Sequence, residues 1–268
     1  MSSRAFFDVD GEDFVPTSWA RGPWGQMVSG NYAGGLLGYA VDNAVTDTEL
    51  HPARLTVDLL RPVAMAPVQL QTSVRRSGRR LHLLDASMTQ NGVEVARAGA
   101  LYLRRGEQPS GDRWTTPITM PPLPPDPDPI EADVTTLVWT FGNDGDRPSR
   151  GLGGWAHAGP KYMWVRDLVP LVDGVELTPF TRAAMAGDMA SSLTHFGADG
   201  LPFINADYTL TLSRLPRSEY LGLAALTHHS DDGVATGTAV LVDTDGPIGT
   251  ATATALANPG FTPAGGIG

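Results

Sequence analysis

The sequence contains no cysteine, few basic residues and no long apolar run. Without cysteine among its 268 residues, the protein cannot form a disulfide, a thiolate metal site or a thiol nucleophile. The 19 Lys and Arg residues are outnumbered by 29 Asp and Glu residues, which gives a formal net charge of -10. Proteins that bind nucleic acids normally carry a basic stripe that neutralises phosphates, so we expect no nucleic-acid partner.

The lack of long apolar segments limits the class of protein further. No stretch approaches the roughly 20 apolar residues that a membrane-spanning helix needs. Residues 1–10 lack the basic segment followed by an apolar run that a secretory signal requires. Hydrophobic residues still make up 41% of the chain, which is enough to bury a core. The sequence therefore predicts a folded cytoplasmic protein without a membrane span.

The most informative pattern that is present is a long internal repeat. Residues 55–62 (LTVDLLRP) return 153 positions later as residues 208–215 (YTLTLSRL). Each copy follows a small-residue helical segment and precedes about forty strand-like residues. A repeat of this length favours two similar halves that share one core over an array of short repeats.

Each half begins with an expected helix of small and apolar residues. The first covers residues 31–45 and includes three glycines, each of which disfavours a helix by about 1 kcal/mol relative to Ala. Such a helix is stable only when it is buried. The second runs from Thr178 to Leu193, with Thr178 as the N-cap and Pro179 at the first helical position.

Antiparallel strands are expected after each helix. In the first half, alternating or apolar runs predict strands at 54–61, 68–75, 81–90 and 93–103, with Asn91-Gly92 as a two-residue hairpin turn. In the second half, they predict strands at 162–166, 203–213, 220–229, 234–242 and 248–256, with Asp245-Gly246 as the corresponding turn.

A proline-rich connector separates the halves. Residues 109–129 contain eight prolines, which lack an amide donor and disfavour a helical residue before them. Some twenty such residues, at about 3.1 Å each, reach roughly 60 Å, so the connector is long enough to cross the molecule. We expect an N-terminal repeat at 1–108, a connector at 109–160 and a C-terminal repeat at 161–268.

A helix of small residues followed by a long antiparallel meander suggests a hotdog, a curved sheet wrapped around a buried helix. Four motifs mark this arrangement: residues 33–38 (AGGLLG), residues 59–62 (LLRP), residues 186–188 (AGD) and the terminal Asp-Gly hairpin. In the order and spacing of these motifs, the sequence resembles the thioesterase-like, double-hotdog acyl-CoA thioesterases, the group that includes acyl-CoA thioesterase II. The resemblance covers most of the chain outside the connector. The resemblance implies an α+β double hotdog, with one continuous curved sheet around two central helices.

Asp188 is the first candidate for chemistry, because it matches Gly35 when the two copies are superimposed. A carboxylate in mid-helix either faces solvent or lies in a partly desolvated site, where its pKa rises and it becomes a better general base. Asp is seldom buried without a partner, which favours solvent, whereas the repeat asymmetry and the resemblance favour the site. The resemblance implies that Asp188 activates a water that attacks a thioester carbonyl, with no metal or organic cofactor.

The resemblance also implies two hydrogen-bonding partners for that water. The family usually has a Thr on the first strand after the second helix and a Gln on the final strand. Here Asn205 and Thr254 align with these positions, and both depart from the pattern. Asn205 is alternatively a strand-end residue satisfied by backbone, and Thr254 is alternatively one of a row of threonines on one strand face, with Thr250 and Thr252.

Gly34 and Gly35 are the predicted substrate contacts. Glycines at a helix start let a ligand approach backbone amides, and the helix dipole there favours negative charge. By resemblance this is the oxyanion or thioester carbonyl site. Close packing of the helix is the alternative explanation.

Three histidines receive structural interpretations. His195 lies seven residues after Asp188, whereas hotdog hydratases have a His about five residues after the Asp, so a hydratase is disfavoured. We interpret His195 as a helix C-terminal residue that the dipole favours. His228 and His229 are adjacent on an expected strand and face opposite ways, which argues against a shared metal site.

Serines and arginines near the repeat motifs are also interpreted structurally. Ser191 and Ser192 have no Gly-x-Ser-x-Gly context, so we expect them to line the helix face near Asp188 rather than act as nucleophiles. Arg61 and Arg214 match between the repeats and are candidates for contacts with coenzyme A phosphates. No phosphate cradle accompanies them, so exposed strand-end residues are the preferred interpretation.

These observations predict an acyl-CoA thioesterase that hydrolyses a fatty or other acyl-CoA with water activated by Asp188. The alternative is a non-catalytic acyl or acyl-CoA binding protein, which the departures at Asn205 and Thr254 favour. Double-hotdog chains often associate further, so a homo-oligomer is left open.

Overall fold

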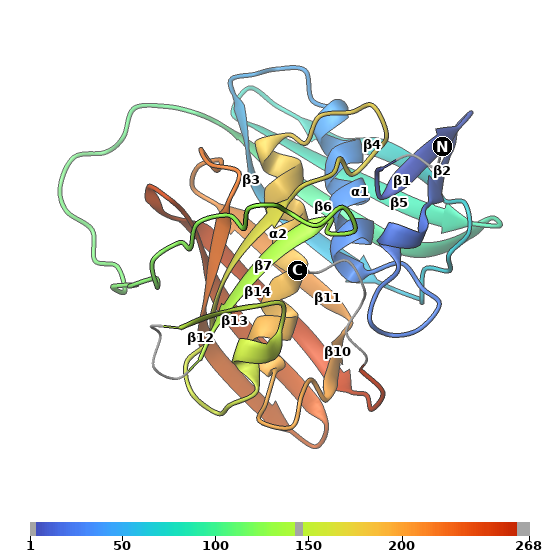
Figure 1. Ribbon diagram of the computed structural model, residues 1–268. Coiled ribbons are helices and arrows are strands. Elements are labelled where there is room, and N and C mark those ends of the chain that lie inside the picture. The colour runs from blue at the N-terminus through green and yellow to red at the C-terminus, as the bar shows by residue number, and fades with distance from the viewer. Residues whose placement is uncertain (1–3, 143–146, 262–268) are drawn as a thin grey trace.

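The computed structural model describes residues 4–142 and 147–261. Two long helices lie side by side against one curved twelve-stranded antiparallel sheet, as the resemblance implied (Figure 1). This is the predicted α+β double hotdog. Within the described residues no helix combines the length and apolarity needed to cross a membrane.

The N-terminal repeat contains helix α1 (Gly30–Asn43) and a four-stranded meander. Its strands are β3 (Leu50–Leu59), β4 (Gln69–Ser77), β5 (Leu81–Gln90) and β6 (Val93–Arg104). Asn91 and Gly92 both have positive φ (50° and 74°) between β5 and β6, so the predicted hairpin turn is confirmed. A small hairpin, β1 (Phe7–Asp10) with β2 (Asp13–Pro16), and the short helix η1 (Ser18–Ala20) precede α1.

The C-terminal repeat contains helix α2 (Pro179–His195), with the Thr178 hydroxyl accepting the Thr181 amide as its N-cap. Its strands are β9 (Tyr162–Asp167), β10 (Phe203–Asn205), β11 (Asp207–Leu212), β12 (Leu221–Asp231), β13 (Val234–Asp243) and β14 (Gly246–Ala257). The predicted strand 203–213 is thus divided into two. The predicted turn at Asp245-Gly246 was one residue too late, because Asp243 pairs with Gly246 and leaves Thr244-Asp245 between them.

The two repeats are related by an approximate twofold axis between β3 and β11. These strands are antiparallel neighbours, and Thr56 pairs with Thr209, the residue 153 positions later. Their hydroxyls are 3.1 Å apart. Because β3 and β11, the equivalent strands of the two repeats, pair with each other, the sheet is continuous. The same pairing brings α1 and α2 together on the concave side of the sheet.

The connector crosses from one end of the sheet toward the other. Residues 105–127 form no helix or strand and run from β6 to β7, which lies beyond β12 and β9 in the strand order β4-β5-β6-β3-β11-β14-β13-β12-β9-β7-β8. Later residues of the predicted connector form β7 (Thr136–Phe141), β8 (Pro148–Arg150) and the short helix η2 (Gly153–Trp155), which the sequence patterns did not identify.

Two apolar clusters stabilise this arrangement. The large one fills the space between the helices and the concave face of the sheet. A smaller one lies under the connector, where Met120 and Leu123 pack on Trp164 and Val242. The Trp164 indole donates a hydrogen bond to the Pro121 carbonyl (2.9 Å), which fastens the connector to the second half.

Candidate functional site

Asp188 lies in the middle of α2 and faces the beginning of α1. A Cβ added to Gly30, the first residue of α1, would be 2.8 Å from both carboxylate oxygens of Asp188, so only glycine leaves room for them. Burial raises the pKa of Asp188 to about 6, against the opposing effect of its hydrogen bond with Asn205. A carboxylate of this kind accepts a proton near neutral pH.

Asn205 is next to Asp188, as the sequence predicted. At the end of β10, its side-chain amide donates to Asp188 Oδ1 (2.8 Å) and, more weakly, to the Asp207 carbonyl (3.3 Å). The bond to the Asp207 carbonyl agrees with the alternative interpretation, in which the backbone satisfies the Asn205 side chain. The side chain therefore fits both interpretations, because it bonds to the backbone and to the Asp188 carboxylate.

Thr254 lies away from Asp188. Its side chain is on the outer, exposed face of β14, where its hydroxyl and amide both donate to Asp207 Oδ1 (2.6 and 2.8 Å). The inward neighbours on β14 are Ala253 and Ala255, and Ala255 pairs with Asn205. The structure does not bring Thr254 to the site, because alternate strand residues face opposite ways.

Gly34 and Gly35 are also displaced from their predicted role. Both are buried inside α1, beyond its first turn, and a Cβ at Gly34 would overlap the Tyr208 hydroxyl. A Cβ at Gly35 would be 2.5 Å from Met185 Cγ. These glycines permit close helix packing, the alternative explanation, and the residues that meet Asp188 are Gly30 and its neighbours.

Gly35 nevertheless marks the symmetry-related copy of the site. The 153-residue offset makes Gly35 equivalent to Asp188, and Met185 equivalent to Tyr32. Asp188 and Tyr32 line one pocket, whereas Met185 packs directly on Gly35. Of these two equivalent places, one therefore has a carboxylate and the other is filled by apolar packing.

The Asp188 pocket is small, about 80 Å³, and mainly apolar. Its buried end is formed by Tyr32, Thr136, Val138, Trp155 and Met163, and its more exposed part by Trp19, Arg21, Pro23 and Phe261. Ser29, Asn31, Leu152, Met189 and Ser192 complete the lining. This volume holds a few waters or a small group.

Polar groups converge on the buried end of this pocket. Asn31 is 5% exposed, and its Oδ1 has no hydrogen-bond partner among the described residues. Burial raises the pKa of the Tyr32 hydroxyl further from neutrality, against the opposing effect of the nearby Thr136 and Asn31 side chains. Thr136 donates to Asp167 Oδ1 (3.0 Å), and burial raises the pKa of Asp167 to about 6. Sequence patterns gave no signal for these residues, since three separate segments supply them.

The remaining candidates are structural. Ser192 lines the pocket as expected, and Ser191 is buried beside it on α2. Arg61 is exposed, as preferred, but Arg214 is not: it makes a bidentate ion pair with buried Asp243 (2.6 and 2.7 Å). Burial opposes ionisation of Asp243, yet the bonds from Arg214 and backbone amides hold its pKa at about 2.

The interpretation of His195 as a helix C-terminal residue is confirmed, because it is the last residue of α2. Burial, together with the charge of His228, lowers the pKa of His195 to about 4, so the ring is neutral at pH 7 and carries no charge for the helix dipole to stabilise. Its Nδ1 lies 2.9 Å from His228 Nδ1. In the part of the chain that the structure describes, no three His, Asp or Glu side chains are grouped to hold a metal ion.

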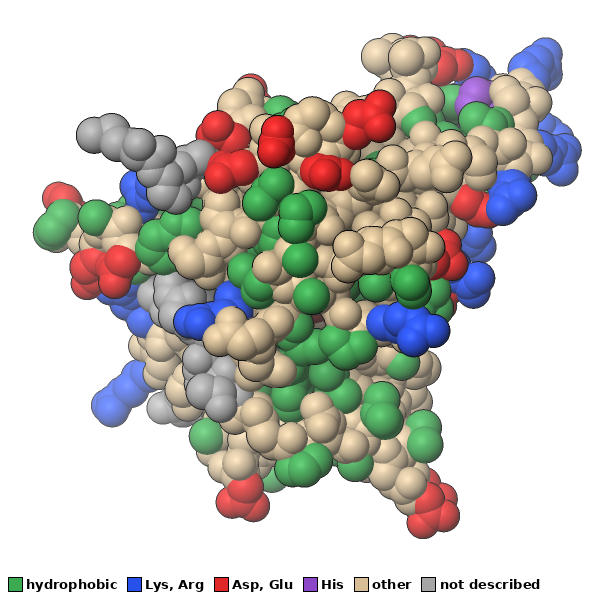
Figure 2. Space-filling view, turned by 90° about the vertical axis from the view of Figure 1, so that its right-hand side faces the viewer, with side chains coloured by type: hydrophobic (Ala, Val, Ile, Leu, Met, Phe, Trp, Pro, Cys, Tyr) green, Lys and Arg blue, Asp and Glu red, His purple; other side chains and the backbone are tan. Residues whose placement is uncertain are grey.

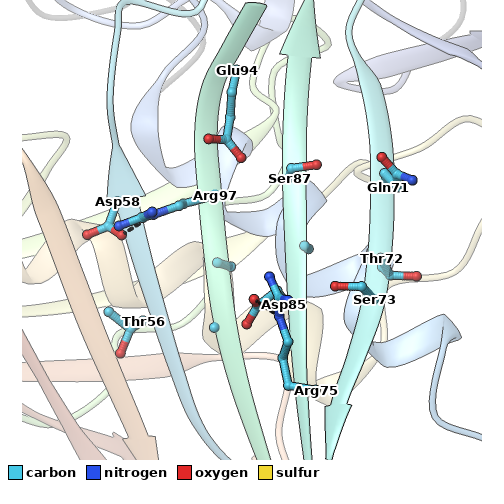
Figure 3. A pocket seen from close by; sticks show the side chains of 13 residues that line it. Thr56, Asp58, Gln71, Thr72, Ser73, Arg75, Asp85, Ser87, Glu94 and Arg97 are labelled. Atoms are coloured by element: carbon cyan, nitrogen blue, oxygen red, sulfur yellow. Dashed lines mark hydrogen bonds and ion pairs between the residues drawn. The ribbon is translucent and has the colours of Figure 1, made fainter.

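A larger hollow lies elsewhere, on the outer face of β3 to β6, with a volume of about 630 Å³ (Figure 3). Its charged side chains are largely paired: Arg97 donates to Asp58 (2.8 Å) and Arg75 to Asp85. Thr56, Gln71, Ser73 and Ser87 add neutral polar groups. It lies on the side of the sheet opposite the helices, away from Asp188, and Glu94, its carboxylate outside these ion pairs, is exposed to solvent. The Asp188 pocket, with its buried carboxylate, is therefore the candidate active site.

Solved structures share this fold. The tesB protein of Mycobacterium avium subspecies paratuberculosis is 16% identical over 94% of this chain and 95% of its own, with a TM-score of 0.65. Acyl-CoA thioesterase II TesB2 of Mycobacterium marinum is 16% identical over 96% of both chains (TM-score 0.63). A hot dog protein of Alicyclobacillus acidocaldarius is 18% identical over 96% of both (TM-score 0.62). Among curated proteins, none matches the sequence significantly.

Family models identify the chain directly. Residues 20–103 match the acyl-CoA thioesterase N-terminal domain, and residues 117–257 match the acyl-CoA thioesterase C-terminal domain. Together these matches cover most of the chain, in the order of its two repeats. The chain therefore belongs to the acyl-CoA thioesterase family and is a thioester hydrolase of double-hotdog fold.

Proposed function

We propose that this protein hydrolyses an acyl-CoA to a free acid and coenzyme A, with water activated by Asp188. The observation that carries this proposal is the Asp188 carboxylate itself: it faces a small pocket, accepts one hydrogen bond from Asn205, and has a pKa of about 6. A thioester is already a reactive acyl compound, so a positioned base and a donor for the oxyanion suffice.

The beginning of α1 supplies the oxyanion donors. The amides of Gly30 and Asn31 have no hydrogen-bond partner among the described residues, and the Ser29 side chain does not cap the helix. Amides at a helix N-terminus stabilise negative charge, and the close approach of Gly30 to Asp188 supports this role for them. The thioester carbonyl oxygen points at these amides in our proposal.

The reaction then balances with these groups alone. The water oxygen bonds to the carbonyl carbon as its proton passes to Asp188, and the Gly30 and Asn31 amides stabilise the oxyanion. When the carbon–sulfur bond breaks, the thiolate receives the proton from Asp188 and leaves as the coenzyme A thiol. Asn205 orients the carboxylate, and Asn31 Oδ1, buried without a described partner, accepts the second hydrogen of the water.

Non-catalytic acyl-CoA binding is the second candidate, and one observation favours it. The final strand presents Ala253 and Ala255 on its inward side, so neither adds a hydrogen bond to the water. Tight acyl-CoA binding in calorimetry without thiol release over hours would support this candidate.

The deciding experiment follows thiol release from a panel of acyl-CoAs with a thiol reagent. We expect Asp188→Asn to lower kcat by roughly 10²- to 10⁴-fold, because an amide cannot accept the proton. The matched control is Asp58→Asn, which removes an Asp in an exposed ion pair with Arg97 on the outer face. Equal rates for wild type and Asp188→Asn would refute the assignment of Asp188.

A further inference from the structure

Four aromatic side chains form a continuous series of ring contacts at the Asp188 pocket, and two of them, Phe261 and Trp155, line it. Phe261 contacts Trp24 (ring centroids 5.5 Å apart) and Phe196 (5.8 Å), and Phe196 contacts Trp155 (5.8 Å), each nearly edge to face. We call Trp24, Phe261 and Phe196 the aromatic cover. They come from the loop before α1, from residues 258–261 (the C-terminal segment) and from the residue that follows α2, and the cover rests on Trp155 at the buried end of the pocket.

The C-terminal segment is built to place Phe261 there. After β14 ends, the Asn258 amide donates to the Pro202 carbonyl (2.8 Å), and Gly260 adopts φ +103°, a conformation that other residues rarely take. The chain thereby turns back over the pocket, and Phe261 becomes part of its lining. The segment lies beyond residue 257, where the match to the acyl-CoA thioesterase C-terminal domain ends.

One side of the pocket carries a positive charge, and the other side is apolar. Arg21 is the one basic residue in its described lining; it is exposed, and its side chain forms no ion pair within the described residues. The polyanionic coenzyme A portion of a substrate fits beside Arg21, whereas an acyl group fits under the apolar cover.

Figure 2, which shows the side where the β1–β2 hairpin and β10 lie, has apolar side chains gathered in its centre and acidic ones concentrated at its top.

The closed pocket is too small for a long acyl chain. Sites for drug-sized ligands typically measure about 300–1,000 Å³, whereas this pocket measures about 80 Å³. We propose that Phe261 determines the acyl groups accepted: the C-terminal segment closes over short acyl groups, and the Phe261 ring occupies the space that a longer chain needs. This inference rests on the proposed function.

The test compares Phe261→Ala with wild type on butyryl-CoA and lauroyl-CoA. We expect the ratio of kcat/KM for lauroyl-CoA to that for butyryl-CoA to rise roughly tenfold or more, since each methylene admitted to an apolar pocket is worth about this factor. Deletion of residues 259–268 should shift the ratio in the same direction. The matched control is Trp114→Ala, because Trp114 is an aromatic residue on the connector that is 88% exposed.

A second measurement tests the role of Phe261 independently of the proposed hydrolysis. Calorimetry with non-hydrolysable butyl and dodecyl thioethers of coenzyme A reports acyl fit without catalysis. Tighter dodecyl binding by Phe261→Ala, with butyl binding retained, supports the cover even if no acyl-CoA is hydrolysed. If Phe261→Ala is active and its preference among acyl chain lengths is that of wild type, the proposed role of Phe261 is refuted and the proposed function is unaffected.

Discussion

At the residue scale, the environment of Asp188 accounts for its proposed reactivity. Burial penalises its charge, while one hydrogen bond from Asn205 offsets part of that penalty and leaves the pKa at about 6. The ordinary pKa of an Asp is near 4, so this carboxyl is a markedly stronger base than an exposed one. Gly30 keeps both oxygens unobstructed by a side chain.

The pH dependence of kcat/KM follows from this pKa. A general base works only when ionised, so kcat/KM should fall about tenfold per pH unit below pH 6 and be level above it. Removing the Asn205 bond, which lowers the pKa, should move the midpoint upward in Asn205→Ala. Rate measurements between pH 4 and 9 check both expectations.

Asp167 is the control for this profile, because its pKa is also raised by burial to about 6 and it contacts Thr136 of the pocket lining. If Asp188 is the base, Asp167→Asn retains the midpoint near pH 6. A midpoint that disappears in Asp167→Asn and persists in Asn205→Ala without a shift contradicts the account.

At the scale of elements, the site depends on how closely the start of α1 approaches the middle of α2. Small residues make this approach possible: Gly34 and Gly187 both leave room for the Tyr208 ring, and Gly38 packs against Ala184. The Tyr208 hydroxyl donates to the Ala184 carbonyl (2.8 Å), which fixes the ring between the helices. The proposed oxyanion donors on α1 and the proposed base on α2 thus belong to different halves.

Gly30→Ala tests this contact. A methyl group at 2.8 Å from both Asp188 oxygens forces the carboxylate to move, and a misplacement of about 1 Å can cost roughly 100-fold in rate. We expect kcat/KM to fall by roughly 10- to 100-fold while the circular dichroism spectrum stays that of wild type. Gly106→Ala, where a Cβ has open space, is the matched control. Retained activity in Gly30→Ala would show that the carboxylate position is unimportant.

The elements themselves were largely predictable from sequence. Hairpin turns, N-caps and the alternation of apolar and polar residues depend on local sequence, so the predicted bounds of the helices and of most strands lie close to the observed ones. Thr254 was misplaced because an alignment error of one residue reverses which face of a strand a side chain occupies. The strands β7 and β8 follow the prolines and were missed because they depend on distant pairing: β7 pairs with β9, beyond η2, and β8 pairs only with β7.

At the scale of the whole molecule, one duplicated fold has become asymmetric. The axis at Thr56 and Thr209 relates the two halves of the sheet and the two helices, yet only one of the two equivalent positions, Gly35 and Asp188, carries a carboxylate. Met185 fills the other. The connector covers part of the outer face of the second half, around Trp164 and Val242, whereas the outer face of the first half carries a polar hollow (Figure 3).

The composition of the pocket could not be predicted from sequence. Asp188 and Asn205 were identifiable because the repeat and the family pattern mark their positions. Arg21, Thr136 and Phe261 come from a loop, an unpredicted strand and the C-terminal segment, and only tertiary packing brings these together. No periodicity or spacing rule connects such distant residues.

The central claim is that Asp188 activates a water rather than attacking the thioester itself. A single turnover in ¹⁸O-labelled water, with enzyme in excess over acyl-CoA and mass spectrometry of both products and protein, tests it most directly. If Asp188 activates water, the free acid is labelled in the first turnover and Asp188 stays unlabelled. Unlabelled acid together with label in the Asp188 carboxylate would contradict it, because that pattern requires an acyl-enzyme anhydride.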